Sequence, residues 1–112
     1  MRIVHIDCSR ITDWESFHTA FAEALGFPGF YGRNMNAWID CMSYLDQADS
    51  GMSSVTVPAG EVLTLHLDGV DEFVGRCPEQ NAALMECAAF VNWRRSRQGE
   101  GALLALSFHK TS

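Results

Sequence analysis

The residues of this chain that have the chemistry for catalysis or metal binding are four histidines and four cysteines. They are His5, His18, His66 and His109, and Cys8, Cys41, Cys77 and Cys87. The histidines are spread over the chain, with neither an H-E-x-x-H motif nor a Cys/His run at zinc spacing. No G-x-S-x-G or cysteine-nucleophile signature accompanies them. We therefore expect structural histidines, no metal site, no cofactor and no enzymatic activity.

The cysteine pattern and the N-terminus bear on the compartment. The cysteines contain no C-x-x-C pair and no dense framework, which predicts buried or partly buried free thiols in a reducing compartment. The sequence leaves open whether Cys41 and Cys87 pair. The apolar run at the N-terminus is interrupted by His5 and Asp7, and no stretch approaches the ~20 apolar residues of a membrane span. We expect a cytoplasmic protein without membrane contact.

The charge of the chain is unevenly distributed. The net charge is -6, yet residues 34–75 contain no Lys or Arg and carry -7, whereas the rest carries eight basic and seven acidic residues. The acidic residues of this segment are Asp40, Asp46, Asp49, Glu61, Asp68, Asp71 and Glu72. This balance argues against direct nucleic-acid binding and favours a basic protein partner. The alternative is an acidic surface that serves only solubility.

Hydrophobic spacing then indicates the elements of the N-terminal half. Residues 2–6 predict a strand, and a capping box at Thr12 and Glu15 predicts a helix that ends at Gly26. An aromatic loop over 27–32 follows, and Asn34 is a competent cap for a second helix. One side of that helix is apolar, with Met35, Trp38, Met42 and Leu45, and the other is polar, with Asn36, Asp40, Ser43 and Gln47. Ile39 lies at the border as a candidate contact residue.

The C-terminal half continues the alternation of strands and helices. Residues 46–60 read as a surface connection with an extended piece at 55–57, and 62–67 as a strand. A helical turn over 71–75 precedes a long helix from Pro78 towards Gly99. Its expected apolar surface consists of Ala82, Met85, Ala89, Val91 and Trp93. The cluster Arg94–Arg97 falls in its last turn, where cations complement the helix dipole.

The order of these elements predicts the fold class. With residues 102–108 as the last strand, three strands are joined by helical crossovers. That order predicts an α/β domain over residues 1–112, with a small three-stranded parallel sheet and about four helices. The glycines at 26, 29 and 32 follow a helix instead of joining a strand to one, so they do not form a nucleotide-binding fingerprint.

Residues 27–42, FPGFYGRNMNAWIDCM, resemble the barstar family of intracellular ribonuclease inhibitors. The similar block is an L/F-P-x-Y/F-Y-G-x-N-x-x-A-x-x-D-C-L/M pattern. The resemblance implies an inhibitor that docks its second helix and the preceding loop in a ribonuclease active site. A helix carboxylate, here Asp40, then takes the place of a substrate phosphate. The other partner-binding positions carried over are Phe30, Tyr31, Gly32, Asn34, Met35, Asn36, Ile39 and Ser43.

Elementary electrostatics agrees with this resemblance. A ribonuclease holds phosphate with Arg, Lys or protonated His, which a carboxylate on a rigid helix can satisfy. We expect Asp46 and Asp49 to act as steering charges towards a basic ribonuclease or RNase toxin domain, bound by a monomer as a 1:1 heterodimer. Two alternatives stay open: an enzyme that pairs Asp40 with a histidine brought near by folding, and an immunity or regulatory adaptor protein of the same fold.

The sequence also departs from the family pattern. The best-known member has a second helix carboxylate where this chain has Asn36, and an exposed Trp where it has Ile39. No acid stands around 92–94, where the family has a partner-facing Glu. We therefore expect a ribonuclease of related type with a different contact surface.

Overall fold

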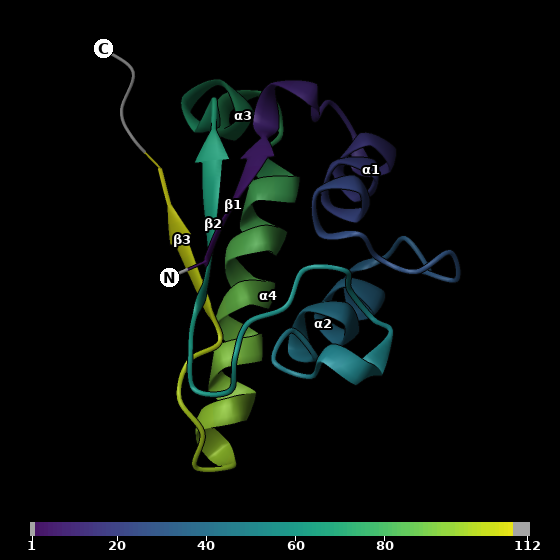
Figure 1. Cartoon of the computed structure of the whole chain (residues 1–112). Coiled ribbons are helices and arrows are strands. Elements are labelled where there is room, and N and C mark those ends of the chain that lie inside the picture. Colours follow the sequence, from purple (N-terminus) through teal and green to yellow (C-terminus); the bar gives the residue numbers. More distant parts are fainter. Residues whose placement is uncertain (1, 109–112) are drawn as a thin grey trace.

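The computed structural model describes residues 2–108, arranged as a parallel sheet with four α-helices (Figure 1). In chain order the elements are β1 (Arg2–Asp7), η1 (Cys8–Arg10), α1 (Trp14–Leu25), α2 (Met35–Ser43), η2 (Ala48–Ser50), β2 (Leu63–Asp68), α3 (Val70–Arg76), α4 (Pro78–Arg97) and β3 (Leu104–Ser107). The strand order is β1-β2-β3, and both neighbouring pairs are parallel. The predicted fold class is confirmed.

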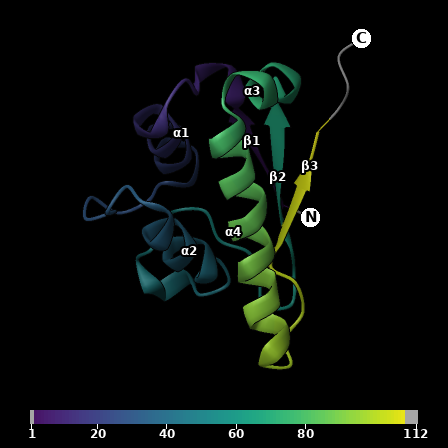
Figure 2. The same ribbon diagram turned by 180° about the vertical axis from the view of Figure 1, so that it is seen from behind.

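The sheet buries one face. Leu63, Leu65 and Leu67 of β2 are buried, whereas the alternating residues Thr64, His66 and Asp68 are half-buried. Helix α4 runs along the sheet on its far side in Figure 1 and in front of it in Figure 2, where the view is reversed. The helical layer therefore covers the leucine face, and the face with the polar side chains remains accessible.

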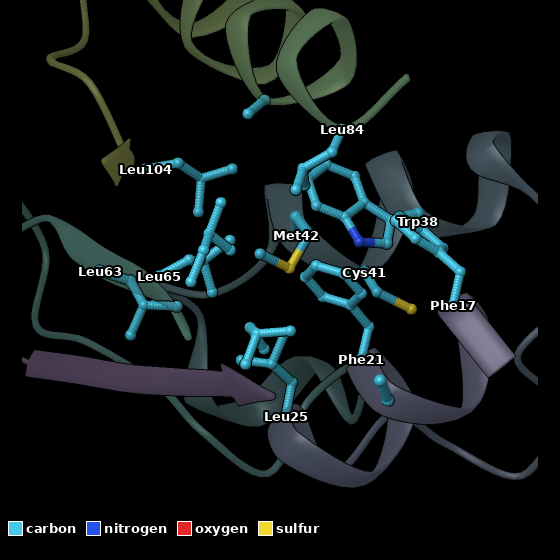
Figure 3. Close-up of a cluster of buried hydrophobic side chains, with 14 of the residues drawn as sticks. Phe17, Phe21, Leu25, Trp38, Cys41, Met42, Leu63, Leu65, Leu84 and Leu104 are labelled. Atoms are coloured by element: carbon cyan, nitrogen blue, oxygen red, sulfur yellow. The ribbon is translucent and has the colours of Figure 1, made fainter. Parts of the chain in front are cut away.

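The core joins α1 and α2 to this covered face (Figure 3). Phe17 and Phe21 of α1 and Trp38 and Met42 of α2 are fully buried. The rings of Phe21 and Trp38 meet edge to face at 5.7 Å. Each such side chain contributes about 1.5–3 kcal/mol of hydrophobic stabilisation, so the inner side of α2 is firmly anchored.

Helix α1 begins one residue later than the predicted capping box implies. The backbone N–H of Ser16 donates to the Asp13 carboxylate at 2.8 Å, and the Asp13 N–H donates to Ser16 Oγ at 3.0 Å. The capping box is therefore Asp13 with Ser16, and the prediction of Thr12 with Glu15 was wrong. The predicted end at Gly26 is confirmed, since this residue has φ of 64°, a conformation that glycine adopts without strain.

Helix α4 packs with a face other than the predicted one. Its buried residues are Gln80, Leu84, Ala88 and Val91. Of the predicted apolar surface only Val91 is buried; the others, Ala82, Met85, Ala89 and Trp93, are exposed. This helix carries apolar residues on both sides, so their spacing did not distinguish the packed side from the solvent side. None of the helices within residues 2–108 has the length and apolarity needed to cross a bilayer.

The connection between α2 and β2 is fastened to the helices. The expected extended piece at 55–57 is not a strand. Instead the backbone N–H of Val55 donates to the carbonyl of Leu25 at 3.3 Å, and that of Val57 to the carbonyl of Leu45 at 2.9 Å. The side chain of Val57 is buried. These bonds hold the connection against the C-terminal ends of α1 and α2.

Candidate functional site

Helix α2 presents a polar side to solvent because its apolar side is fixed in the core. Asn34 caps the helix as predicted, since its side-chain oxygen accepts a hydrogen bond from the Ala37 N–H at 2.8 Å. Trp38 and Met42 point inward, which leaves Asn36 and Asp40 exposed. The predicted division of this helix into a buried and an exposed side is confirmed.

Asp40 lies at the centre of this surface. It borders three adjoining hollows: one towards Phe30 and Met52, one towards Tyr44 and Gln47, and one of about 330 Å³ towards Arg94 on α4. Within residues 2–108 the Asp40 carboxylate forms no hydrogen bond or ion pair. Its acceptor sites are therefore open to an external donor.

Phe30 projects from the loop that precedes α2. At 76% exposure it is the most exposed large apolar side chain of the described chain. Its neighbour Tyr31 is directed the other way, with 9% exposure and its hydroxyl 2.6 Å from Nδ1 of His18 on α1. The Tyr31 N–H also donates to the carbonyl of Pro28 at 2.9 Å. The two contacts of Tyr31 thus fix the turn on its buried side, while Phe30 points outward.

The buried pair of His18 and Tyr31 is a structural element of the loop. Burial lowers the pKa of His18, and the nearby Arg33 guanidinium lowers it further. Burial also raises the pKa of Tyr31, so both side chains are held neutral. Tyr31 borders the hollow beside Phe30 but is mostly buried. Most of the Tyr31 side chain therefore supports the loop, and its predicted role as a contact residue stays a prediction for the small part that borders this hollow.

Arg33 ties the same loop to α1. Its Nη2 donates to the carbonyl of Glu15 at 2.8 Å and to Oγ1 of Thr19 at 2.7 Å. Arg33 has φ of 54°, the one positive value among non-glycine residues of the described chain. Sequence reasoning missed Arg33 and His18 as supports of the loop, because their contacts span 13 to 18 residues and no local pattern indicates them.

Asp46, which is predicted to be a steering charge, is paired with an arginine of the same chain. Its carboxylate accepts a hydrogen bond from Arg95 Nη2 at 2.8 Å, and the two side chains are 10% and 12% exposed. Arg94 likewise donates to Ser43 Oγ at 2.6 Å. These arginines lie in the last turn of α4, as predicted, but they also join α4 to α2. Asp49 is exposed, and its role in steering stays a prediction.

The acidic segment does not form one surface. Glu61 precedes β2, and Asp68 ends that strand. Asp71 and Glu72 lie in the first turn of α3, which Figure 1 shows at the top of the molecule, well away from α2. Of the seven acidic residues, Asp40 and Asp49 are therefore the exposed carboxylates near α2.

The remaining predicted contact residues differ in exposure and position: Gly32 and Ser43 share hollows with Asp40, whereas Asn34 and Met35 line a separate hollow beside Trp14 and His18. Gly32, Asn34 and Asn36 are exposed, whereas Met35, Ile39 and Ser43 are half-buried. Ile39 packs partly against the core, so only part of it faces solvent. Sequence reasoning missed Met52 and Tyr44, which line hollows beside Asp40. The position of Tyr44, four residues after Asp40, was a usable signal, but that of Met52 was not.

Within the described residues no histidine lines the hollows around Asp40, so the Asp–His pair that an enzyme would need is not found there. The adjacent thiol, Cys41, is buried, and that burial with the Asp40 charge raises its pKa to about 11. All four cysteines are free, three buried and Cys87 half-buried, which confirms that prediction. His109 lies outside the described residues.

Comparison with known proteins gives a family match over nearly the whole chain. The family model described as Barstar (barnase inhibitor) matches residues 1–106. A search of curated proteins finds no match. The family match spans every described helix and nearly all of the last strand, including the loop and the helix that carry Phe30 and Asp40.

Proposed function

Because the chain belongs to the Barstar (barnase inhibitor) family, whose members are inhibitors and not enzymes, we propose that it inhibits a ribonuclease through α2 and the loop over 27–33. The partner is a basic ribonuclease or an RNase toxin domain, bound by one copy of this chain. In this assignment the protein acts by covering the active site and carries out no reaction itself.

The observation that carries the proposal is the open carboxylate of Asp40. A ribonuclease active site is lined by Arg, Lys or His groups that bind phosphate. An anionic carboxylate on a helix can accept charge-assisted hydrogen bonds from those groups in place of the phosphate. Since Trp38 and Met42 fix the helix, Asp40 is held in place before the partner arrives.

Phe30 supplies the apolar anchor beside Asp40. Aromatic side chains that fill a pocket are common binding hot spots. Since Tyr31, His18 and Arg33 hold the loop, little conformational freedom has to be lost there on binding. Gly32, Asn34, Met35, Asn36, Ile39 and Ser43 form the surrounding contact area.

The charges around α2 define what the partner must offer. Asn36 provides no second carboxylate, and Arg94 stands at the α4 side of the surface. The partner therefore presents its cationic site to Asp40 and a neutral or acidic edge to α4. Asp49 lies outside the centre and accelerates the encounter with a basic enzyme.

The test is inhibition of RNA cleavage. Purified protein is titrated against barnase-type ribonucleases and against any ribonuclease encoded beside its gene, with a fluorogenic RNA substrate. We expect cleavage by the cognate enzyme to fall to zero near one equivalent, and Asp40→Ala to shift the curve strongly. Unchanged cleavage with every enzyme of the panel would contradict the proposal.

A second candidate function is an adaptor that binds a non-nuclease protein through the same surface. Asn36 and Ile39 favour it, because they stand where the best-known member of the family has a carboxylate and an exposed Trp, so two contact residues expected of a nuclease inhibitor are absent. Affinity capture from the producing cell, followed by mass spectrometry, distinguishes the two when the captured protein is assayed for ribonuclease activity. Capture abolished by Asp40→Ala, with no ribonuclease activity in the captured protein, would favour the adaptor.

A further inference from the structure

Two histidines and a carboxylate meet on the sheet face that the helices leave accessible. His5 of β1 is the register partner of His66 of β2, and their ring centroids lie 5.0 Å apart. Asp68 follows two residues later on the same face of β2. One potential ligand atom from each residue lies within 4.8 Å of the other two. Parallel pairing of β1 and β2 thus brings His5 beside two metal-ligating groups, of which Asp68 is 63 residues away in sequence.

The distances suit a small cation. Nδ1 of His5 lies 2.9 Å from Oδ2 of Asp68, and Nε2 of His66 lies 3.6 Å from Oδ1 of Asp68. Around a tetrahedral Zn²⁺ ion with bonds of about 2.0–2.1 Å, neighbouring ligand atoms lie about 3.3 Å apart. The two separations, each to a different oxygen of the Asp68 carboxylate, lie on either side of that value, and the ligand atoms of the two histidines lie within 4.8 Å of one another, so side-chain rotations can bring the three groups onto one ion.

The ring of His66 is also oriented as ligating histidines are. Its Nδ1 lies 2.9 Å from Oγ of Ser107 on β3. When Nδ1–H donates to Ser107, the lone pair of Nε2 is directed to the side of Asp68. A hydrogen bond from the non-ligating ring nitrogen is the usual outer support of a metal-bound histidine, because it fixes the tautomer and the ring plane.

We propose that His5, His66 and Asp68 bind one divalent first-row transition ion, with Zn²⁺ as the preferred ion and solvent completing the coordination. Two imidazoles and one carboxylate suit zinc, whereas Mg²⁺ and Ca²⁺ prefer oxygen ligands throughout. The side chains of His5, His66 and Asp68 are 66%, 18% and 39% exposed, which gives an ion access from solvent. The site lies on the face away from α4, so it does not depend on the proposed function of α2.

Such an ion joins the first strand to the second. A ligand that binds the folded chain and not the unfolded one raises the thermal midpoint of unfolding as its concentration rises. Saturating Zn²⁺ therefore raises the melting temperature of the wild-type protein. The variants His5→Ala and Asp68→Asn show no such shift.

The direct test is calorimetric titration of the tag-free full chain with ZnCl₂. We expect one equivalent to bind, at least 100-fold weaker binding in His5→Ala and in Asp68→Asn, and about 10- to 100-fold weaker binding in Ser107→Ala. Cys87→Ser is the matched control, since Cys87 is the one half-buried thiol among the four and is absent from the proposed site. It binds zinc as the wild type does, and MgCl₂ gives no binding heat.

Imidazole ¹⁵N spectra locate the bound ion. Zinc shifts the ring nitrogens of His5 and His66 and leaves those of buried His18 unchanged. The proposal is overturned if the wild type shows no saturable zinc binding, if His5→Ala binds as tightly as the wild type, or if Cys87→Ser abolishes binding. Circular dichroism confirms that each variant is folded, which is expected at the exposed position of His5.

Discussion

Replacing Asp40 by alanine tests whether this carboxylate mimics a substrate phosphate or is only one charge of an acidic surface. Asp40 is exposed and makes no hydrogen bond within residues 2–108, so its removal leaves the free energy of unfolding within about 0.5 kcal/mol of the wild-type value. In the complex this carboxylate is desolvated against the cations of the enzyme. Its truncation leaves those cations buried and unpaired, which costs about 2–5 kcal/mol of binding free energy. The inhibition constant therefore rises by about 30-fold to several thousand-fold.

Asp49→Ala is the matched control, because Asp49 is also an exposed aspartate but lies after the motif that contains Asp40. A charge that stays in solvent contributes about 0.2–1 kcal/mol, so this variant weakens inhibition by at most about fivefold. Its effect lies in the association rate and shrinks as the Debye length falls from about 10 Å at 0.1 M salt to about 3 Å at 1 M. The assay measures inhibition constants and association rates of both variants at the two salt concentrations. Equal losses for Asp40→Ala and Asp49→Ala would refute the reasoning.

Four further variants, one of them compared across a pH profile, test Phe30 and the residues that support the site. Phe30→Ala weakens inhibition by about 2 kcal/mol or more without changing the urea midpoint. Tyr31→Phe leaves His18 without its buried partner and lowers the unfolding free energy by about 1–3 kcal/mol in urea denaturation. Burial holds the pKa of His18 below its ordinary value of 6.5, so the unfolded chain binds the proton more readily; stability is complete above pH 6.5 and falls as the pH drops below it. His18→Gln, compared in urea melts across this range, loses that part of the slope. Asp46→Asn removes the more buried of the two carboxylates that pair with Arg95, leaving exposed Glu100 as its remaining charged partner, and lowers the melting temperature, whereas a merely solvated Asp46 predicts no change.

The parts of the structure that sequence reasoning found are those with a clear local period. Alternation of Leu63, Leu65 and Leu67 with polar residues gave the central strand, since one face of the sheet is buried and the other is not. Large apolar residues on a single side of α2 likewise indicated its buried side. In α4 the same argument failed because Met85 and Trp93 supply an equally apolar outer side.

The candidate site was predictable only where it is local. Asn34 and Asp40 belong to one sequence motif and one helix, and both lie where that motif implies. The pairing of Asp46 with Arg95 joins residues 49 positions apart, and the contact of His5 with Asp68 joins residues 63 positions apart. Such tertiary contacts determine which carboxylates are paired within the chain and which are open to a partner protein. A count of acidic residues along the chain therefore overestimates the negative surface near α2.

The length of α2 explains why its orientation must come from the core. A helix of nine residues is too short to be stable alone in water, since isolated helices become marginal below about 12–15 residues. The direction of Asp40 thus depends on the burial of Trp38 and Met42. Trp38→Ala removes about 3–5 kcal/mol of stability and weakens inhibition with it, whereas Asp40→Ala weakens inhibition alone. Urea melts of the two variants measure the contribution of the buried side of α2 to stability. Inhibition curves of the same variants measure the contribution of its exposed side to binding. If Trp38→Ala destabilised the fold yet inhibited at the wild-type constant, the partner would bind elsewhere than on α2.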